Sequence, residues 1–135
     1  MNENKLKHLD FIQGVVNRMA ANSFQIKGWS VTLVSALIAL SLATKEKAAM
    51  IGICFIPVIV FWILDSYFLW QERLFREVYN DVRQKEGKDI DFSMNQQAFI
   101  GGKNTWPATL FSQTIIVFYG SLLAVMIAVL IFLLK

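Results

Sequence analysis

The chain has little of the chemistry from which most active sites are built. Its 135 residues include one cysteine, Cys54, and one histidine, His8. A single cysteine cannot form a disulfide within the chain, and one Cys with one His cannot supply the three or four soft ligands of a zinc site. We therefore expect neither a disulfide framework nor a Cys/His metal cluster, and no cofactor.

Catalytic constellations are also missing from the long apolar runs, which contain one acid, Asp65, and no histidine. Membrane hydrolases need a Ser/His, His/Asp or paired-Asp set. We interpret His8 as a surface residue and Cys54, which has no cation near it in the sequence, as an inert thiol. Gly101 and Gly102 lack the spacing of a P-loop and predict a connecting loop. We expect no enzyme.

Charged residues make up only 17% of the chain and apolar residues 56%, whereas soluble domains average about 25% charged. Three apolar runs, 28–44, 48–70 and 107–134, approach or exceed the roughly 17–25 residues that a helix needs to cross a bilayer. Backbone in hydrocarbon must satisfy its own hydrogen bonds, which short chains achieve as helices. The pattern indicates an integral membrane protein.

The predicted fold class is therefore all-α with three transmembrane helices. Residues 1–27 should form an amphipathic cytoplasmic helix and 28–70 a transmembrane hairpin, while 71–106 should form a cytoplasmic stalk helix and loop, and 107–135 the third span. We expect Gly28 to be a hinge between the first helix and the first span. No signal peptide is expected, so the first apolar run is interpreted as a retained span.

The basic residues predict how the chain is threaded. Ten of its 13 Lys and Arg fall in the two segments that would be cytoplasmic if the N-terminus is inside. This bias follows the positive-inside rule, and Trp29, Trp70 and Trp106 fall at the same interface, as in an aromatic belt. We predict a membrane location with the N-terminus cytoplasmic and the C-terminus outside.

Asp65 is the candidate functional residue, because an acid in a membrane span costs roughly 2.5–3.5 kcal/mol at mid-bilayer and needs a partner. Lys27 lies 19 residues before Glu46 in the predicted turn, and Asp65 lies 19 residues after it. Antiparallel helices would bring these two residues to the same depth. Lys27 is the first candidate partner and Arg18 the second. Three roles stay open: a structural ion pair, a gating or ion-path group, and a solvated interfacial acid.

Two stretches carry an apolar stripe with alternating spacings of three and four, the pattern of packing helices. The predicted stalk helix also has a favourable pair, Glu72 with Arg76, and Arg73 on its charged side. It could pack on the N-terminal helix of the same subunit or on another subunit, and the N-terminal stripe could instead lie on the membrane. The stripes consist of Leu9, Ile12, Val16, Met19, Ser23 and Ile26, and of Phe68, Gln71, Phe75, Val78 and Val82.

Small residues recur at helical spacing in two of the spans. The third has Gly120, Ala124 and Ala128, and the first has Ser35 and Ala39. Small residues let helix backbones approach closely in lipid. One face could pack inside the subunit and leave the other for a neighbour, which predicts a homo-oligomer. A close-packed monomer is the alternative.

Four segments resemble a group of small, mostly uncharacterised bacterial membrane proteins associated with TIR-like or nucleotide-signalling genes in anti-phage defence regions. They are RMAANSF at 18–24, KGWSVT at 27–32, FWILDSY at 61–67 and ERLFR at 72–76. The similarity covers residues 10–85 and implies a membrane effector of a defence system with a cytoplasmic signalling protein as a possible partner.

The leading functional hypothesis is an oligomeric effector that permeabilises or depolarises the bacterial inner membrane. The alternative is a non-catalytic anchor or adaptor that recruits a cytoplasmic partner through the stalk. A constitutive channel or transporter subunit ranks third, because spans with one ionisable group line a solute path poorly. Basic residues are intermixed with acids, so no nucleic-acid partner is expected.

Overall fold

The computed structural model describes residues 2–135 and is built from helices. They are α1 (Glu3–Leu42), α2 (Lys47–Gln84), the 3₁₀ turns η1 (Gly87–Asp89) and η2 (Gln96–Phe99), α3 (Trp106–Leu110) and α4 (Gln113–Leu134). No β-strand occurs among residues 2–135, where an isolated bridge joins Gly101 to Asn104. The expected all-α class is confirmed.

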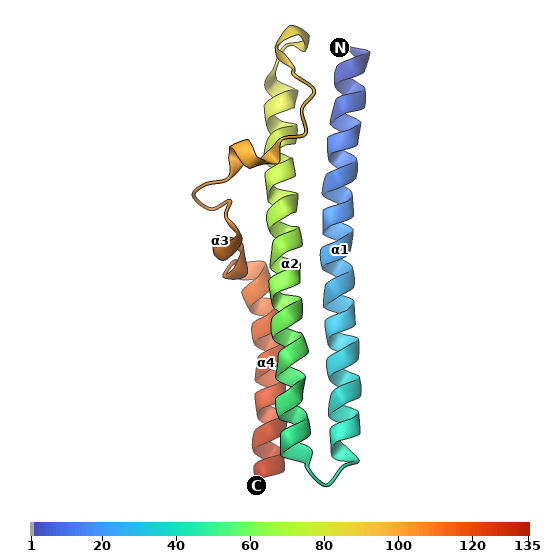
Figure 1. Cartoon of the computed structure of the whole chain (residues 1–135), viewed down its shortest axis with the longest axis vertical. Coiled ribbons are helices and arrows are strands. Elements are labelled where there is room, and N and C mark those ends of the chain that lie inside the picture. The colour runs from blue at the N-terminus through green and yellow to red at the C-terminus, as the bar shows by residue number, and fades with distance from the viewer. Residues whose placement is uncertain (1) are drawn as a thin grey trace.

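Helices α1 and α2 form a long antiparallel hairpin, and α4 packs beside the lower part of α2 (Figure 1). The N-terminus and the C-terminal end of α2 lie at one end of the molecule, and the α1–α2 turn lies with the C-terminus at the other. We call residues 3–22 and 67–84 the two-helix stalk, and residues 23–42, 47–66 and 113–134 the three-helix segment. Residues 85–112 are the connector.

The hinge expected at Gly28 is wrong, because α1 runs without interruption through that residue. A glycine inside a helix costs only about 1 kcal/mol relative to alanine. Its neighbours Ser23, Ile26 and Ser30 are all buried, so tertiary packing on both sides of Gly28 holds the helix straight across it. The predicted amphipathic helix and first span are one element.

The third apolar run is divided, contrary to the prediction of one helix from Pro107. Thr105 caps α3 by accepting a hydrogen bond from the Ala108 amide, but the helix stops at Leu110 and α4 begins at Gln113. The Leu110 carbonyl accepts the Trp62 indole N–H at 2.9 Å. This side-chain bond takes up an acceptor that a continuous helix would pair with a backbone amide.

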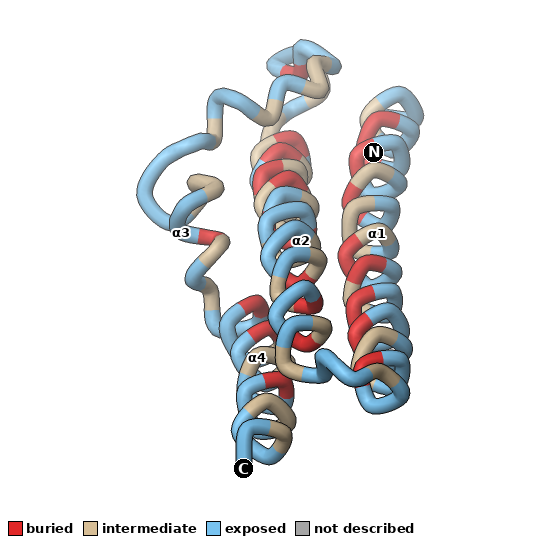
Figure 2. The backbone as a smooth tube through the Cα atoms, turned by 60° about the horizontal axis from the view of Figure 1, so that its bottom comes forward, coloured by how far each residue is buried: buried red, intermediate tan, exposed pale blue. Residues whose placement is uncertain are grey.

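The interior consists of two apolar clusters, seen as buried stripes where the helices face one another (Figure 2). In the three-helix segment the cluster is formed by Val34, Cys54, Val58, Ile115, Tyr119 and Met126. In the stalk it is formed by Leu9, Ile12, Val78, Val82 and Ile90, the last from the connector. The predicted stripes of α1 and α2 thus pack on each other within one subunit.

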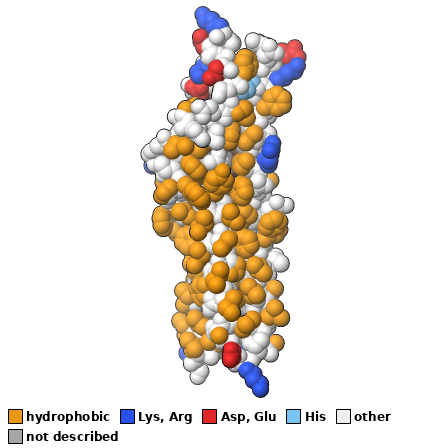
Figure 3. Space-filling view, viewed as in Figure 1, with side chains coloured by type: hydrophobic (Ala, Val, Ile, Leu, Met, Phe, Trp, Pro, Cys, Tyr) orange, Lys and Arg blue, Asp and Glu red, His pale blue; other side chains and the backbone are white. Residues whose placement is uncertain are grey.

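The outer surface changes character along the molecule. Charged side chains gather at the two ends, and a long stretch of the face in Figure 3 is covered mainly by hydrophobic ones. Helices α1, α2 and α4 are each long and apolar enough to cross a membrane. An apolar exterior of this length is what a hydrocarbon solvent requires.

Candidate functional site

Asp65 lies at the point where all three long helices meet, and its side chain is fully buried. Its carboxylate is 2.6 Å from the Lys27 ammonium of α1. The predicted Lys27–Asp65 ion pair is therefore confirmed, while its gating role stays a prediction. Both residues lie the same number of residues from the turn. Two antiparallel helices with the same rise per residue therefore place them at the same depth.

Two hydroxyl groups complete the shell of the carboxylate. The Ser23 hydroxyl donates to one oxygen of Asp65, and the Tyr119 hydroxyl of α4 donates to the other at 3.0 Å. The Lys27 ammonium also donates to the Ser23 oxygen at 2.9 Å. We call Ser23, Lys27, Asp65 and Tyr119 the polar cluster; each of its members bonds to at least one other, and together they join α1, α2 and α4.

Aromatic rings surround this cluster. Tyr119 stacks on Trp62 with ring centroids 6.0 Å apart and nearly parallel planes. The Lys27 ammonium lies 5.7 Å from the centre of the Phe118 ring, within the range of a cation–π contact. Such neighbours exclude water, which strengthens the attraction between the paired charges and makes the loss of either one costly.

The depth of the cluster follows from helix geometry. Lys27 is 19 residues from Glu46 in the turn, which corresponds to roughly 28 Å of helix. This distance is close to the hydrocarbon thickness of a bilayer, about 30 Å. A bilayer placed around the three-helix segment would therefore have the cluster near one of its two interfaces.

The prediction of Arg18 as the second candidate partner of Asp65 is wrong. Its side chain is exposed, and it forms no ion pair among residues 2–135. Nine residues separate it from Lys27, about 13 Å along the helix, so its guanidinium lies well away from the carboxylate.

Sequence reasoning missed Ser23 and Tyr119 as partners of Asp65. Ser23 stands four residues before Lys27, the spacing that places both on one face of α1, and this was a usable signal. Tyr119 is the one tyrosine in the third apolar run. A hydroxyl there needs a buried partner, which could also have been inferred.

Tryptophan indoles fasten the connector to α2 close to the polar cluster. Trp106 donates to the Ser66 hydroxyl at 3.1 Å, and Trp70 donates to the Asn104 carbonyl at 2.9 Å. The Trp70 and Trp106 rings stack, with centroids 6.0 Å apart. Trp29, predicted at the same level, is more than half exposed. These contacts position the start of α4 relative to Asp65.

His8 is not the surface residue that the sequence suggested. It is buried, and its ring meets the Phe92 ring edge-on at 5.3 Å. Phe92 adopts the left-handed backbone conformation, φ 58°, as the connector folds back over the stalk. The neighbouring acid, Asp10, is exposed. His8 is buried because the Phe92 ring of the connector packs against it, whereas Asp10 stays outside this contact.

The small-residue faces also differ from expectation. Gly120, Ala124 and Ala128 of α4 are exposed, and so are Ser35 and Ala39 of α1. We expected one face to pack inside the subunit, but α4 packs on α2 through Ile115, Tyr119 and Met126 instead. Larger side chains thus fill the interior, and both small faces lie on the outer surface.

Within the stalk, Gln71 is buried and accepts a hydrogen bond from Gln96 of η2 at 3.2 Å. Arg76 pairs with Glu72 at 2.7 Å, as predicted. Lys5 donates to the Arg83 and Lys85 carbonyls and so satisfies the C-terminal end of α2. Hydrogen bonding to Asp81 raises the pKa of Lys85. These contacts stabilise the stalk and its junction with the connector.

No group of three or more His, Cys, Asp or Glu side chains within residues 2–135 is arranged to hold a metal ion. Comparisons of the chain with protein-family models, with curated proteins and with solved structures found no match. The candidate site is the polar cluster, because it holds the buried ion pair that joins α1 to α2.

Proposed function

We propose that this chain is a bacterial inner-membrane effector that, as an oligomer, permeabilises or depolarises the membrane in anti-phage defence. The observation that carries the proposal is the Lys27–Asp65 pair, which together with Tyr119 joins all three long helices. In this proposal the closed pair holds a resting state. A trigger received by the stalk separates the charges, and the helices then rearrange.

Three further features support this reading. Both small-residue faces are exposed, which offers surfaces through which copies could assemble. The stalk is continuous with α1 and α2, which carry Lys27 and Asp65, and in this proposal the two helices transmit a movement from the end of the stalk to the pair. The defence context comes from the similarity of residues 10–85 to membrane proteins of defence regions. The proposed orientation is N-terminus cytoplasmic and C-terminus outside.

The proposal includes no catalytic activity, cofactor or nucleic-acid partner. Its partners are the lipid bilayer, further copies of the chain and a cytoplasmic signalling protein. Breaking the buried pair should favour the rearranged state, because an unpaired charge in a water-excluding site is strongly destabilised. The resting state should then be lost without any trigger.

A voltage-sensitive dye in cells that express the chain tests this directly. We expect wild type to stay polarised until phage is added, and Asp65→Asn to depolarise the cells without phage. Asp89→Asn, an exposed acid of the connector, is the matched control and should behave as wild type. Equal membrane potentials for all three proteins, with membrane accumulation verified, would contradict the proposal.

A second function, a membrane anchor that recruits a soluble partner, is favoured by one observation. Phe11 is 71% exposed on the stalk beside Phe92, although both lie far from the three-helix segment. Phe11 and Phe92 line a shared hollow together with Asn4 and Lys7, and apolar patches with a polar rim mark interaction sites. Arg83, in the last turn of α2, is exposed as well. An anchor predicts that Phe11→Ser or Arg83→Glu abolishes membrane recovery of a cytoplasmic protein while the membrane potential never changes.

A further inference from the structure

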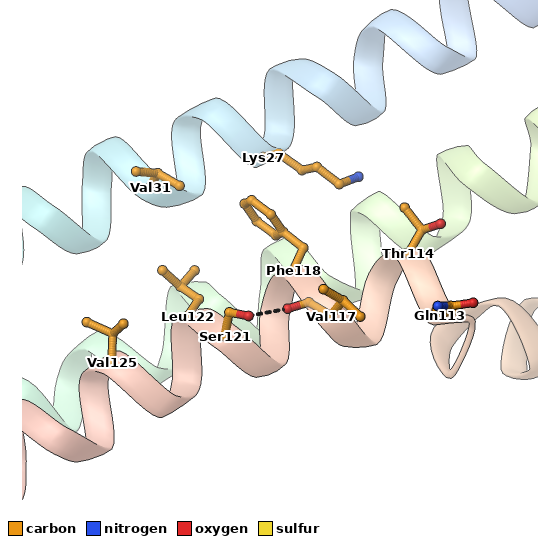
Figure 4. A pocket seen from close by; sticks show the side chains of 9 residues that line it. All are labelled: Lys27, Val31, Gln113, Thr114, Val117, Phe118, Ser121, Leu122 and Val125. Carbon is orange, nitrogen blue, oxygen red and sulfur yellow. Dashed lines mark hydrogen bonds between the residues drawn. The ribbon is translucent and has the colours of Figure 1, made fainter.

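A groove separates α1 from α4 on the side of the three-helix segment where these two helices do not pack closely, with α2 behind it (Figure 4). Its volume is about 670 Å³. The groove is open along its length, so in a bilayer hydrocarbon would enter it. The residues lining it are Lys27, Val31, Gln113, Thr114, Val117, Phe118, Ser121, Leu122 and Val125.

The two ends of the groove differ in polarity. Figure 4 shows Lys27 reaching from α1 toward the end where Gln113 and Thr114 of α4 lie. The rest of the wall is apolar, and Ser121 adds no free donor because its hydroxyl bonds to the Val117 carbonyl at 2.6 Å. A ligand that fits this gradient has a polar head at one end and an apolar tail.

Lys27 has capacity for such a head. An ammonium carries three N–H donors, of which one faces Asp65 and one faces Ser23. Its side chain is 20% exposed, and the exposed part lines the groove. The third donor can therefore reach an acceptor there. Asp65 already compensates the charge of Lys27. What Lys27 offers a ligand is therefore mainly a hydrogen-bond donor, which favours a strong acceptor such as a phosphate.

We propose that the groove binds a membrane phospholipid. The phosphate of the headgroup accepts from Lys27 and from Gln113 or Thr114, and one acyl chain follows Val31 and the α4 wall toward Val125. The position of Lys27, about one hydrocarbon thickness from the turn, is the level at which lipid phosphates begin. This inference rests on the proposed membrane insertion but not on the proposed depolarisation.

A helix from a second copy fits the groove less well. It would bring apolar side chains against Lys27, Gln113 and Thr114, whose donors would then lack acceptors. A lipid satisfies the polar end and fills the apolar end with the same molecule. Dimer formation through the groove is nevertheless a separate outcome that the following experiment detects.

The full chain is purified, placed in nanodiscs and exposed to one of two photoactivatable lipids. One is a phosphatidylglycerol with a diazirine in its acyl chain, and the other is a diacylglycerol with the same chains. Because diacylglycerol lacks the phosphate that accepts a charge-assisted hydrogen bond from Lys27, we expect the phospholipid to label 27–31 and 113–125 roughly tenfold more. Equal labelling by both lipids would overturn the phosphate assignment.

Two tryptophan variants locate the site. Ser121→Trp fills the groove and should abolish the labelling, whereas Ile116→Trp, on the exposed face of α4 outside the groove, should leave it unchanged. Labelling that survives Ser121→Trp, or chain-to-chain crosslinks through 113–125 in place of lipid, would overturn the proposal. Dye measurements separate the two proposals, because a wild-type chain that is not labelled in the groove but depolarises cells as expected refutes only the lipid site.

Discussion

The stalk and the three-helix segment share α1 and α2 but differ in what they bury and in what they expose. In the stalk, apolar side chains such as Ile12 and Val78 are inside, and charged ones face outward. In the three-helix segment Ser30, Asp65 and Ser66 are fully buried, while Ile56 is 63% exposed. If the stalk lies in water, the hydrophobic effect holds its two helices together. The three-helix segment, if surrounded by lipid, must depend on polar contacts and close packing.

Removing Asp65 should have the largest effect on stability. Asp65→Ala leaves the largely buried Lys27 ammonium without its counter-charge, which costs about 3–5 kcal/mol. We expect this loss in the free energy of unfolding measured by denaturing-detergent titration of the purified protein. The double variant Lys27→Met/Asp65→Leu should recover most of the stability, since an apolar pair of similar size avoids the unpaired charge. Equal losses in both variants would show that shape, not charge, matters there.

An apolar truncation in the stalk comes next. Ile12 is completely buried, so Ile12→Ala should cost about 2–5 kcal/mol through lost burial and a cavity. Hydrogen exchange should then speed up at amides of the stalk and stay unchanged in the three-helix segment. The control Ile56→Ala, at a position exposed to the surroundings of the three-helix segment, should be nearly neutral. A large cost for Ile56→Ala would show that this face is covered by another molecule.

Tyr119→Phe should produce a smaller loss. It removes the hydroxyl that donates to Asp65 and keeps the ring stacked on Trp62. Interhelical hydrogen bonds in membranes average about 0.6 kcal/mol, with values up to about 1.7. The same detergent titration measures it, and Tyr67→Phe, a partly exposed tyrosine, serves as the control. A cost as large as that of Asp65→Ala would mean that the hydroxyl, and not Lys27, sustains the carboxylate.

The smallest effect is expected for Glu72→Gln on the stalk. Its ion pair with Arg76 joins adjacent turns of α2 and leaves the arginine largely exposed. Such pairs contribute about 0.2–0.5 kcal/mol and weaken with salt. Unfolding at low and high ionic strength should differ slightly for wild type and not for the variant. A loss above 1 kcal/mol would point to a role for Glu72 beyond this pair.

The features predictable from the sequence are those fixed by the regular geometry of a helix. The spacing of Lys27 and Asp65 around the turn predicted their pairing, and the alternating apolar residues predicted which faces of the stalk meet. Both inferences need only a constant rise and a constant number of residues per turn. A charged Asp65 inside a span requires a partner, and Lys27, the candidate predicted at the same depth, is the residue that pairs with it.

The remaining features depend on contacts between distant segments. The end of α3 follows from the bond between Trp62 and Leu110, which are 48 residues apart. The burial of His8 follows from the path of the connector, which places Phe92 over it. The rotation of α4, which leaves Gly120 outside, is decided by how Tyr119 reaches Asp65. Local patterns do not locate these contacts, although the need of the Tyr119 hydroxyl for a buried partner was readable from the sequence.

Ion flux through proteoliposomes that contain only the purified chain tests the central claim most directly, since it separates the protein from every other cell component. The claim is that the Lys27–Asp65 pair holds the three helices in a resting state. We predict that vesicles with Asp65→Asn lose an imposed potassium gradient faster than vesicles with wild type or Lys27→Met/Asp65→Leu. Leakage equal to that of protein-free vesicles for all three proteins would contradict the account.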